Sequence, residues 1–200
     1  MIEFIVGSSL ATAAGLNAWM PLFLLGLADR LLPSVTLPSG WSWLSNDVSL
    51  WIIGLLLVGE VVADKVPALD SVNDVVQSLV RPAAGGIAFG AGSAAQTSAT
   101  DPSTLFVDNA WVPIAVGIAI ALAVHIAKSV IRLGANAVAA GVSAPVLSTA
   151  EDGASFALST SALLAPILAG ALLVALLWAA VMIVRRRQRK STQRPIPDHD

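Results

Sequence analysis

Long apolar runs alternate with short polar segments along the chain. Residues 4–28 and 158–184 are apolar over enough positions to cross about 30 Å of hydrocarbon at about 1.5 Å of helical rise per residue. Residues 48–65 and 111–131 are also apolar over a sufficient length. The pattern therefore predicts four helices that can each span a membrane.

Two further segments, 83–98 and 134–149, are shorter, weakly hydrophobic and rich in Gly, Ala and Ser. Such segments insert poorly alone, so they are either thin helices buried by their neighbours or re-entrant pieces. With them, the prediction is an all-α polytopic membrane protein of about six transmembrane helices. We expect residues 1–184 to form a single transmembrane domain and residues 185–200 a basic, disordered cytoplasmic tail.

The composition agrees with this class. The chain is 56% hydrophobic and 12% charged, whereas soluble domains carry about 25% charged residues. Its net charge of −2 offers no basic surface for nucleic acid, and the absence of cysteine excludes thiolate metal sites. No Walker loop and no histidine pair is present in the sequence, so no cofactor is expected.

The placement of basic residues predicts the orientation. With six spans and the N-terminus inside, ten of the 11 Lys and Arg residues face the cytoplasm, and only Arg30 lies outside. This is a strong positive-inside bias, so both termini are expected on the cytoplasmic side. Glu151 and Asp152 precede the last span and are expected to be solvated charges of an outer loop.

The most informative polar stretch lies at the end of the second predicted span. Glu60 and Asp64 are four residues apart, so both carboxylates project from one helix face, with Lys65 beside them. Glu60 is expected about 7 Å inside the end of the span. A carboxylate at that depth is costly unless it is paired, hydrated or protonated.

A second polar element follows this span. Asp70, Asp74 and Arg81 recur at helical spacing on one face, while the intervening Val and Leu residues face elsewhere. This pattern predicts a short amphipathic helix near 70–81 that lies in the cytoplasmic interface of the membrane.

The span at 111–131 brings a basic strip. His125, Lys128 and Arg132 follow one helix face, and His125 falls at roughly the depth of Glu60. A carboxylate pair that faces this strip has two interpretations. The opposite charges either lock the helices together or form a hydrated cytoplasmic vestibule for an ion or a proton. For Glu60 and His125, the deeper groups, we favour the functional interpretation.

Two asparagines occupy matching positions in the related segments GLNA at 15–18 and GANA at 134–137. Asn17 also stands four residues before Pro21, whose ring leaves a backbone carbonyl without its donor. The amide of Asn17 or Asn136 can cap a broken turn, bond a neighbouring helix or face a pore. Capping or interhelical hydrogen bonding is the favoured interpretation.

Three segments carry a family resemblance: GLNAWMPLFLLGLADR at 15–30, EVVADKVPALDSVNDVVQSLVRPAAGG at 60–86 and GANAVAAG at 134–141. On these segments the chain resembles a family of bacterial integral membrane proteins, domain of unknown function 4126. The second segment is long and polar within an apolar protein, which makes the match fairly specific. The resemblance implies a multi-pass protein of the bacterial cytoplasmic (inner) membrane, and it supplies no substrate.

Three functional hypotheses follow. The first is a small transporter or channel for an ion or small polar solute, with a site that faces the cytoplasm. In it, Glu60 and Asp64 bind a cation or carry a proton, while Lys65, Arg81 and Arg132 balance charge or meet an anionic solute. The alternative is a non-catalytic scaffold or partner subunit whose charges only hold helices together. A lipid-phosphate enzyme that uses the arginines and carboxylates is the third.

The expected surroundings and partners follow from the same features. We expect the lipid bilayer around the chain, an assembly of identical chains, and an ion or small polar solute as ligand. No nucleic acid is expected. The sequence does not identify a metal ion for the site.

Overall fold

The computed structural model describes the backbone of residues 1–100, 109, 111–139 and 143–192, with side chains except those of 67–74, 133–139, 143–144, 183–184 and 186–192. Seven α-helices lie in these ranges: α1 (Ile2–Leu16), α2 (Trp19–Leu31), α3 (Asp47–Ala63), α4 (Pro67–Ala94), α5 (Trp111–Ala139), α6 (Ser143–Leu164) and α7 (Pro166–Thr192). The described chain holds no β-strand beyond isolated bridges. The all-α prediction is confirmed.

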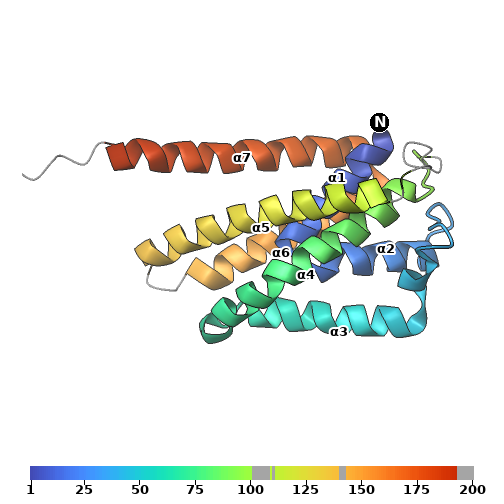
Figure 1. Ribbon diagram of the computed structural model, residues 1–200, viewed down its shortest axis with the longest axis horizontal. Coiled ribbons are helices and arrows are strands. Elements are labelled where there is room, and N and C mark those ends of the chain that lie inside the picture. The colour runs from blue at the N-terminus through green and yellow to red at the C-terminus, as the bar shows by residue number, and fades with distance from the viewer. Residues whose placement is uncertain (101–108, 110, 140–142, 193–200) are drawn as a thin grey trace, which may run out of the picture.

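Helices α1 and α2 form a hairpin instead of the single span predicted over 4–28. Asn17 contacts Asp152 and the carbonyl of Ala13 contacts Ser155, so α1 runs antiparallel to α6. The last turns of α2 and α6 line one groove, so α2 runs parallel to α6. The chain therefore reverses direction between α1 and α2 (Figure 1).

The reversal has a local cause at Asn17. This residue is extended, with φ −142° and ψ 119°. Its side-chain Oδ1 accepts hydrogen bonds from the backbone N–H groups of Trp19 at 3.2 Å and Met20 at 3.1 Å. Asn17 thus caps the first turn of α2, as the capping interpretation of this asparagine anticipated.

Helix α3 matches the span predicted over 48–65, and the side chain of Asn46 caps it by accepting from the N–H of Val48 at 3.0 Å. Helix α4 differs from the prediction. The amphipathic segment 70–81 and the apolar segment 83–98 are largely one helix of 28 residues, which continues through Pro82. The polar and apolar patterns therefore mark two ends of one element.

The segment 134–149 is not a separate span. Its first residues end α5 and its last residues begin α6, so Glu151 and Asp152 lie within α6. The expected outer loop at these two acids is therefore wrong. Helical continuation is possible there because Lys65, in the turn after α3, and Arg132 of α5 pair with the two carboxylates.

The span predicted over 158–184 is divided. Helix α6 ends at Leu164 and α7 begins at Pro166, because proline has no N–H to continue the helix and fits its first turn. Helix α7 then runs to Thr192, so the predicted tail from residue 185 begins within this helix.

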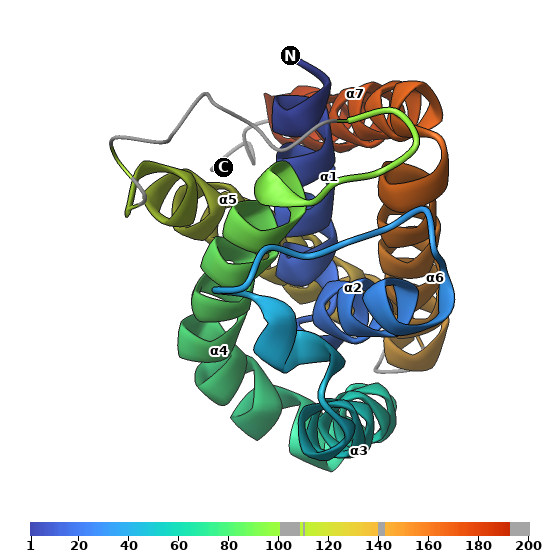
Figure 2. The ribbon, with the colours of Figure 1, turned by 90° about the vertical axis from the view of Figure 1, so that its right-hand side faces the viewer.

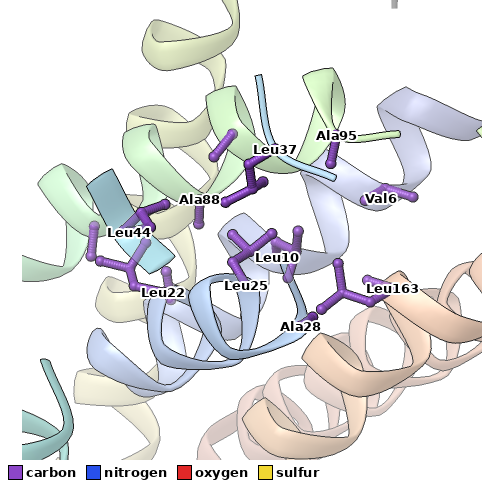
Figure 3. Packing of buried hydrophobic residues seen from close by; sticks show 14 of the residues in the cluster. Val6, Leu10, Leu22, Leu25, Ala28, Leu37, Leu44, Ala88, Ala95 and Leu163 are labelled. Carbon is purple, nitrogen blue, oxygen red and sulfur yellow. The ribbon is translucent and has the colours of Figure 1, made fainter. Parts of the chain in front are cut away.

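Helix α1 is the central element of the bundle. It packs against α4, α5, α6 and α7, with α4 and α6 on opposite sides and α7 across one end (Figure 2). Apolar side chains such as Leu10 of α1, Leu25 of α2 and Ala88 of α4 meet in the core beside it (Figure 3). Helices α4 and α5 approach so closely that a Cβ at Gly117 would lie 2.3 Å from the carbonyl oxygen of Gly85.

One helical stretch in the described chain, Trp111–Arg132, is long and apolar enough to cross a membrane, and Ile2–Leu16 and Pro166–Met182 are apolar but shorter. The start of α1 and the end of α7 lie at opposite ends of the molecule (Figure 1). The membrane side of each terminus stays a prediction.

Candidate functional site

Charged side chains from four helices and the turns beside them meet at the tip of the α1–α2 hairpin. We call this group the charge network. Its four carboxylates and four cations are Glu60, Asp64, Glu151 and Asp152 with Lys65, Arg81, Lys128 and Arg132. The formal charges of these eight groups cancel.

Glu60 connects α3 to the start of α2. Its Oε2 accepts a hydrogen bond from the backbone N–H of Ala18 at 3.0 Å. Its Oε1 accepts from Nη2 of Arg81 at 2.9 Å and from Nε at 3.2 Å. The carboxylate is therefore held by one backbone donor and one guanidinium.

Arg81 is the most deeply buried large side chain of the network, with 0% of its surface exposed. Besides Glu60, its Nη2 reaches Oδ2 of Asp64 at 3.4 Å. Its Nη1 lies 3.2 Å from Nδ1 of His125. Because a guanidinium only donates, Nδ1 of His125 is the acceptor in this contact.

Asp64 is the meeting point of three cations. Its Oδ2 lies 3.1 Å from Nζ of Lys128 and 3.4 Å from Nη2 of Arg132, in addition to the contact with Arg81. Glu151 of α6 shares two of these partners, at 3.0 Å from Lys128 and 2.8 Å from Arg132. Two carboxylates on different helices are thus bridged by two cations of α5.

Asp152 joins the hairpin tip to the end of α3. Its Oδ1 accepts from Nδ2 of Asn17 at 3.0 Å, and its Oδ2 accepts from Nζ of Lys65 at 2.9 Å. Lys65 is the cation of the network with the most exposed side chain, at 34%. The network therefore approaches the molecular surface at Lys65.

Both helix ends at the hairpin tip are bound by charges of the appropriate sign. The carboxylate of Glu60 binds the N–H of Ala18, the N-cap residue of α2, where the helix dipole is positive. The ammonium of Lys128 donates to the last carbonyl of α1, at Leu16, over 3.0 Å, where the dipole is negative. Side chains of α3 and α5 thus satisfy backbone groups that the reversal leaves open.

The family model for a domain of unknown function, DUF4126, matches residues 4–186. The chain belongs to this family. No curated protein and no solved structure matches the chain. Family membership confirms the resemblance seen in three sequence segments, and the match includes the whole charge network.

The sequence of this DUF4126 protein predicts ten site residues, and the structure brings the side chains of seven of them together: Asn17, Glu60, Asp64, Lys65, Arg81, His125 and Arg132. The backbone of Asp70 and Asp74 lies in the first turns of α4, and that of Asn136 in the last turn of α5. The side chains of these three lie outside the described residues.

Three charged groups of the network are not among the site residues that the sequence predicts. Lys128 belongs to the predicted basic strip but not to the predicted site, and the sequence predicts Glu151 and Asp152 in an outer loop. A signal for α6 was present, because Ser148, Asp152 and Ser155 recur at helical spacing and indicate a helix face at these positions. The two backbone partners at the hairpin tip have no sequence signal of this kind.

Two other properties limit the chemistry of the site. Among the described residues, no group of three or more His, Asp or Glu side chains is arranged to hold a metal ion. A groove of about 520 Å³ between α2 and α3 is lined by residues such as Phe23 and Trp51, and its lining contains no member of the charge network. Each charged group of the network forms an ion pair with another member.

Proposed function

We propose that this chain is a small multi-pass membrane transporter or channel for an ion or small polar solute, and that the charge network is its site. The observation that carries the proposal is the hairpin tip, where Glu60 binds the N–H of Ala18 and Lys128 binds the carbonyl of Leu16. Transporters bind ions and solutes at helix ends that open inside the membrane.

Exposed apolar side chains support a bilayer as the surroundings of the bundle. Trp51 and Leu55 on α3 are 80% and 74% exposed, and Ile167 and Trp178 on α7 are 83% and 66% exposed. Apolar surface of this extent is unfavourable in water but is solvated by lipid chains.

The helix lengths suggest how the chain crosses the bilayer. Helices α1 and α2 have 15 and 13 residues, about 22 and 20 Å, which is too short for about 30 Å of hydrocarbon. In our proposal they form a re-entrant hairpin that enters and leaves on one side, while α3 to α7 cross. This is a five-span arrangement in place of six spans.

The basic residues suggest its orientation. Lys65 follows the end of α3, and the basic residues around Arg185 lie in the last part of α7. Both helices run away from the end of the molecule where α1 starts (Figure 1). By the positive-inside rule this end faces the cytoplasm. The proposed site, near Lys65, is then closer to the cytoplasm, and the start of α1 lies on the opposite side.

The ion pairs at the tip suggest a mechanism. Proton or cation binding at Glu60 weakens its bonds to Arg81 and to the N–H of Ala18. The freed guanidinium and N–H can then bind an anionic or polar solute, and the hairpin tip can move relative to α3. Glu60 and Asp64 carry the proton or cation, while Arg81 and Arg132 keep the site neutral.

The completeness of the pairing favours a second candidate function. Each of the eight charged residues of the network has at least one partner of opposite sign within 3.4 Å. Charges arranged in this way can have a purely structural role, which is to hold α3, α4, α5 and α6 in register. The alternative is therefore a non-catalytic membrane scaffold or partner subunit.

Flux through proteoliposomes distinguishes the two functions. Vesicles loaded with a pH-sensitive dye report proton movement when a gradient of protons, Na⁺, K⁺ or Cl⁻ is applied. We expect the wild-type chain to support flux with one of these gradients and Glu60→Gln to reduce it at least tenfold. Asp47→Asn is the control, because Asp47 pairs with Arg30 at an exposed position outside the network.

A second variant separates lost transport from lost folding. Glu60→Gln alone leaves the charge of Arg81 without a carboxylate at 2.9 Å, whereas Glu60→Gln with Arg81→Gln keeps the network neutral. We expect the double variant to fold and to transport no ion. Normal flux in Glu60→Gln would remove Glu60 from the mechanism, and absence of wild-type flux with all four gradients would favour the scaffold.

A further inference from the structure

A stripe of serines extends from the charge network along α6. Ser148, Asp152, Ser155 and Ser159 recur at i, i+4, i+7 and i+11, so they lie on one face of this helix. The three serines are fully buried. Because Asp152 belongs to the network, the stripe continues the polar site into the interior of the bundle.

The register of α6 against α1 shows what this stripe faces. Asp152 bonds to Asn17 of α1, and one turn further along α6 the hydroxyl of Ser155 donates to the carbonyl of Ala13 over 3.0 Å. The two helices are antiparallel, so the next turn of α6 brings Ser159 opposite Ser9 of α1. Ser9 is fully buried as well.

The register therefore places two serines opposite each other in the buried seam between α1 and α6. Among the residues that the structure describes, neither Oγ of Ser9 nor Oγ of Ser159 has a hydrogen-bond partner. A buried hydroxyl without a partner is unfavourable, and proteins commonly satisfy such groups with ordered water. Two facing hydroxyls supply polar partners for a water molecule between them.

We propose that the seam between α1 and α6 is a water-binding path that begins at the charge network and extends through Ser155 to Ser9 and Ser159. Seven residues of α6 separate Asp152 from Ser159, which corresponds to about 10 Å along the helix axis. The path leads toward the end of the molecule where α1 begins, away from Lys65. Its use as an ion or proton route rests on the proposed function, whereas the presence of water in it does not.

Introduced cysteines test this path directly, because the natural chain contains no cysteine. Ser9→Cys and Ser159→Cys change the hydroxyl to a thiol of similar size. The folded variants are exposed to Ag⁺, which enters narrow aqueous paths, and are then unfolded so that the remaining free thiols can be counted with a fluorescent maleimide. We expect both thiols to be consumed by Ag⁺ in the folded protein.

Matched controls lie on the same two helices. Ala14 of α1 and Ala162 of α6 are fully buried in the hydrophobic core, so Ala14→Cys and Ala162→Cys are expected to react with Ag⁺ at least tenfold more slowly. Equal rates for the serine and alanine positions would overturn the proposal. Size-exclusion profiles that match wild type establish that each variant is folded.

A cross-linking experiment tests the register on which the proposal depends. In the double variant Ser9→Cys with Ser159→Cys, a mild oxidant is expected to form an intramolecular disulfide, whereas Ser9→Cys with Ala162→Cys is expected to cross-link less. If the double variant does not cross-link while each single thiol is reactive, the seam does not bring Ser9 and Ser159 together and the path is wrong. If the thiols react quickly with Ag⁺ but the protein shows no flux, the water path is supported and only the proposed transport function is contradicted.

Discussion

Arg81 is the residue on which the charge network depends most. Its side chain is fully buried: Nη2 donates to both Glu60 and Asp64, Nε also donates to Glu60, and Nη1 contacts His125. A lysine has a single nitrogen at this position and cannot reproduce that set of contacts. The planar guanidinium therefore fixes the relative positions of α3, α4 and α5 at one point.

Replacement of this guanidinium should destabilise the protein strongly. Arg81→Gln leaves two buried carboxylates with fewer cations, which typically costs about 3–5 kcal/mol. Arg30→Gln removes a solvent-exposed ion pair with Asp47, and such pairs contribute about 0–1 kcal/mol. Thermal unfolding in detergent, followed by circular dichroism, should show a much larger decrease in Tm for Arg81→Gln. Similar decreases for the two variants would contradict a structural role of the network.

At the scale of elements, the α1–α2 hairpin is the feature that positions the site. The reversal requires one extended residue, and Asn17 supplies both this conformation and the cap of the next helix. Its amide nitrogen then ties the turn to Asp152 of α6. One side chain thus connects the hairpin to the network.

Asn17→Ala should loosen the hairpin tip. Loss of an N-cap typically costs about 1–2 kcal/mol, and the variant also removes the hydrogen bond to Asp152. Hydrogen exchange measured by mass spectrometry should show faster exchange in the first turn of α2, at Trp19 and Met20, with little change in α7. Asn17→Ser keeps a capping oxygen and should recover part of the protection. Unchanged exchange at Trp19 and Met20 in Asn17→Ala would show that the cap does not hold the turn.

Hydropathy and helical spacing predict part of these elements. The limits of α3 and the start of α5 follow from apolar length, and the grouping of Glu60, Asp64 and Arg81 follows from their helical spacing. The reversal at Asn17 is hidden because it lies inside an apolar run, where the break is caused by one side chain. The expected loop at Glu151 and Asp152 follows from their position ahead of the last predicted span. Their helix is stabilised by ion pairs with Lys65, in the turn after α3, and with Lys128 and Arg132 of α5, and these are tertiary contacts.

At the scale of the whole molecule, the bundle surrounds a short central helix. Helix α1 is covered by α4, α5, α6 and α7 (Figure 2), while its last carbonyl meets the charge network. A central helix that ends inside the bundle places polar backbone groups where a spanning helix would have none. Its start and the end of α7 then lie at opposite ends of the molecule (Figure 1).

This arrangement predicts a specific membrane topology. If α1 and α2 form a re-entrant hairpin, a tag ahead of residue 1 should lie on the same side of the membrane as the exposed Ser39 in the loop that follows α2, and opposite to the exposed Arg185 of α7. In intact spheroplasts, a membrane-impermeant maleimide should label Ser39→Cys, whereas Arg185→Cys should react only after permeabilisation. A protease added outside should remove the tag.

A protected tag with an accessible Ser39→Cys would mean that residues 4–28 cross the membrane once, and the hairpin would then not persist in the bilayer. If the tag and position 39 are accessible from one side and position 185 from the other, the chain must reverse between α1 and α2. This reversal is where the charge network binds both helix ends.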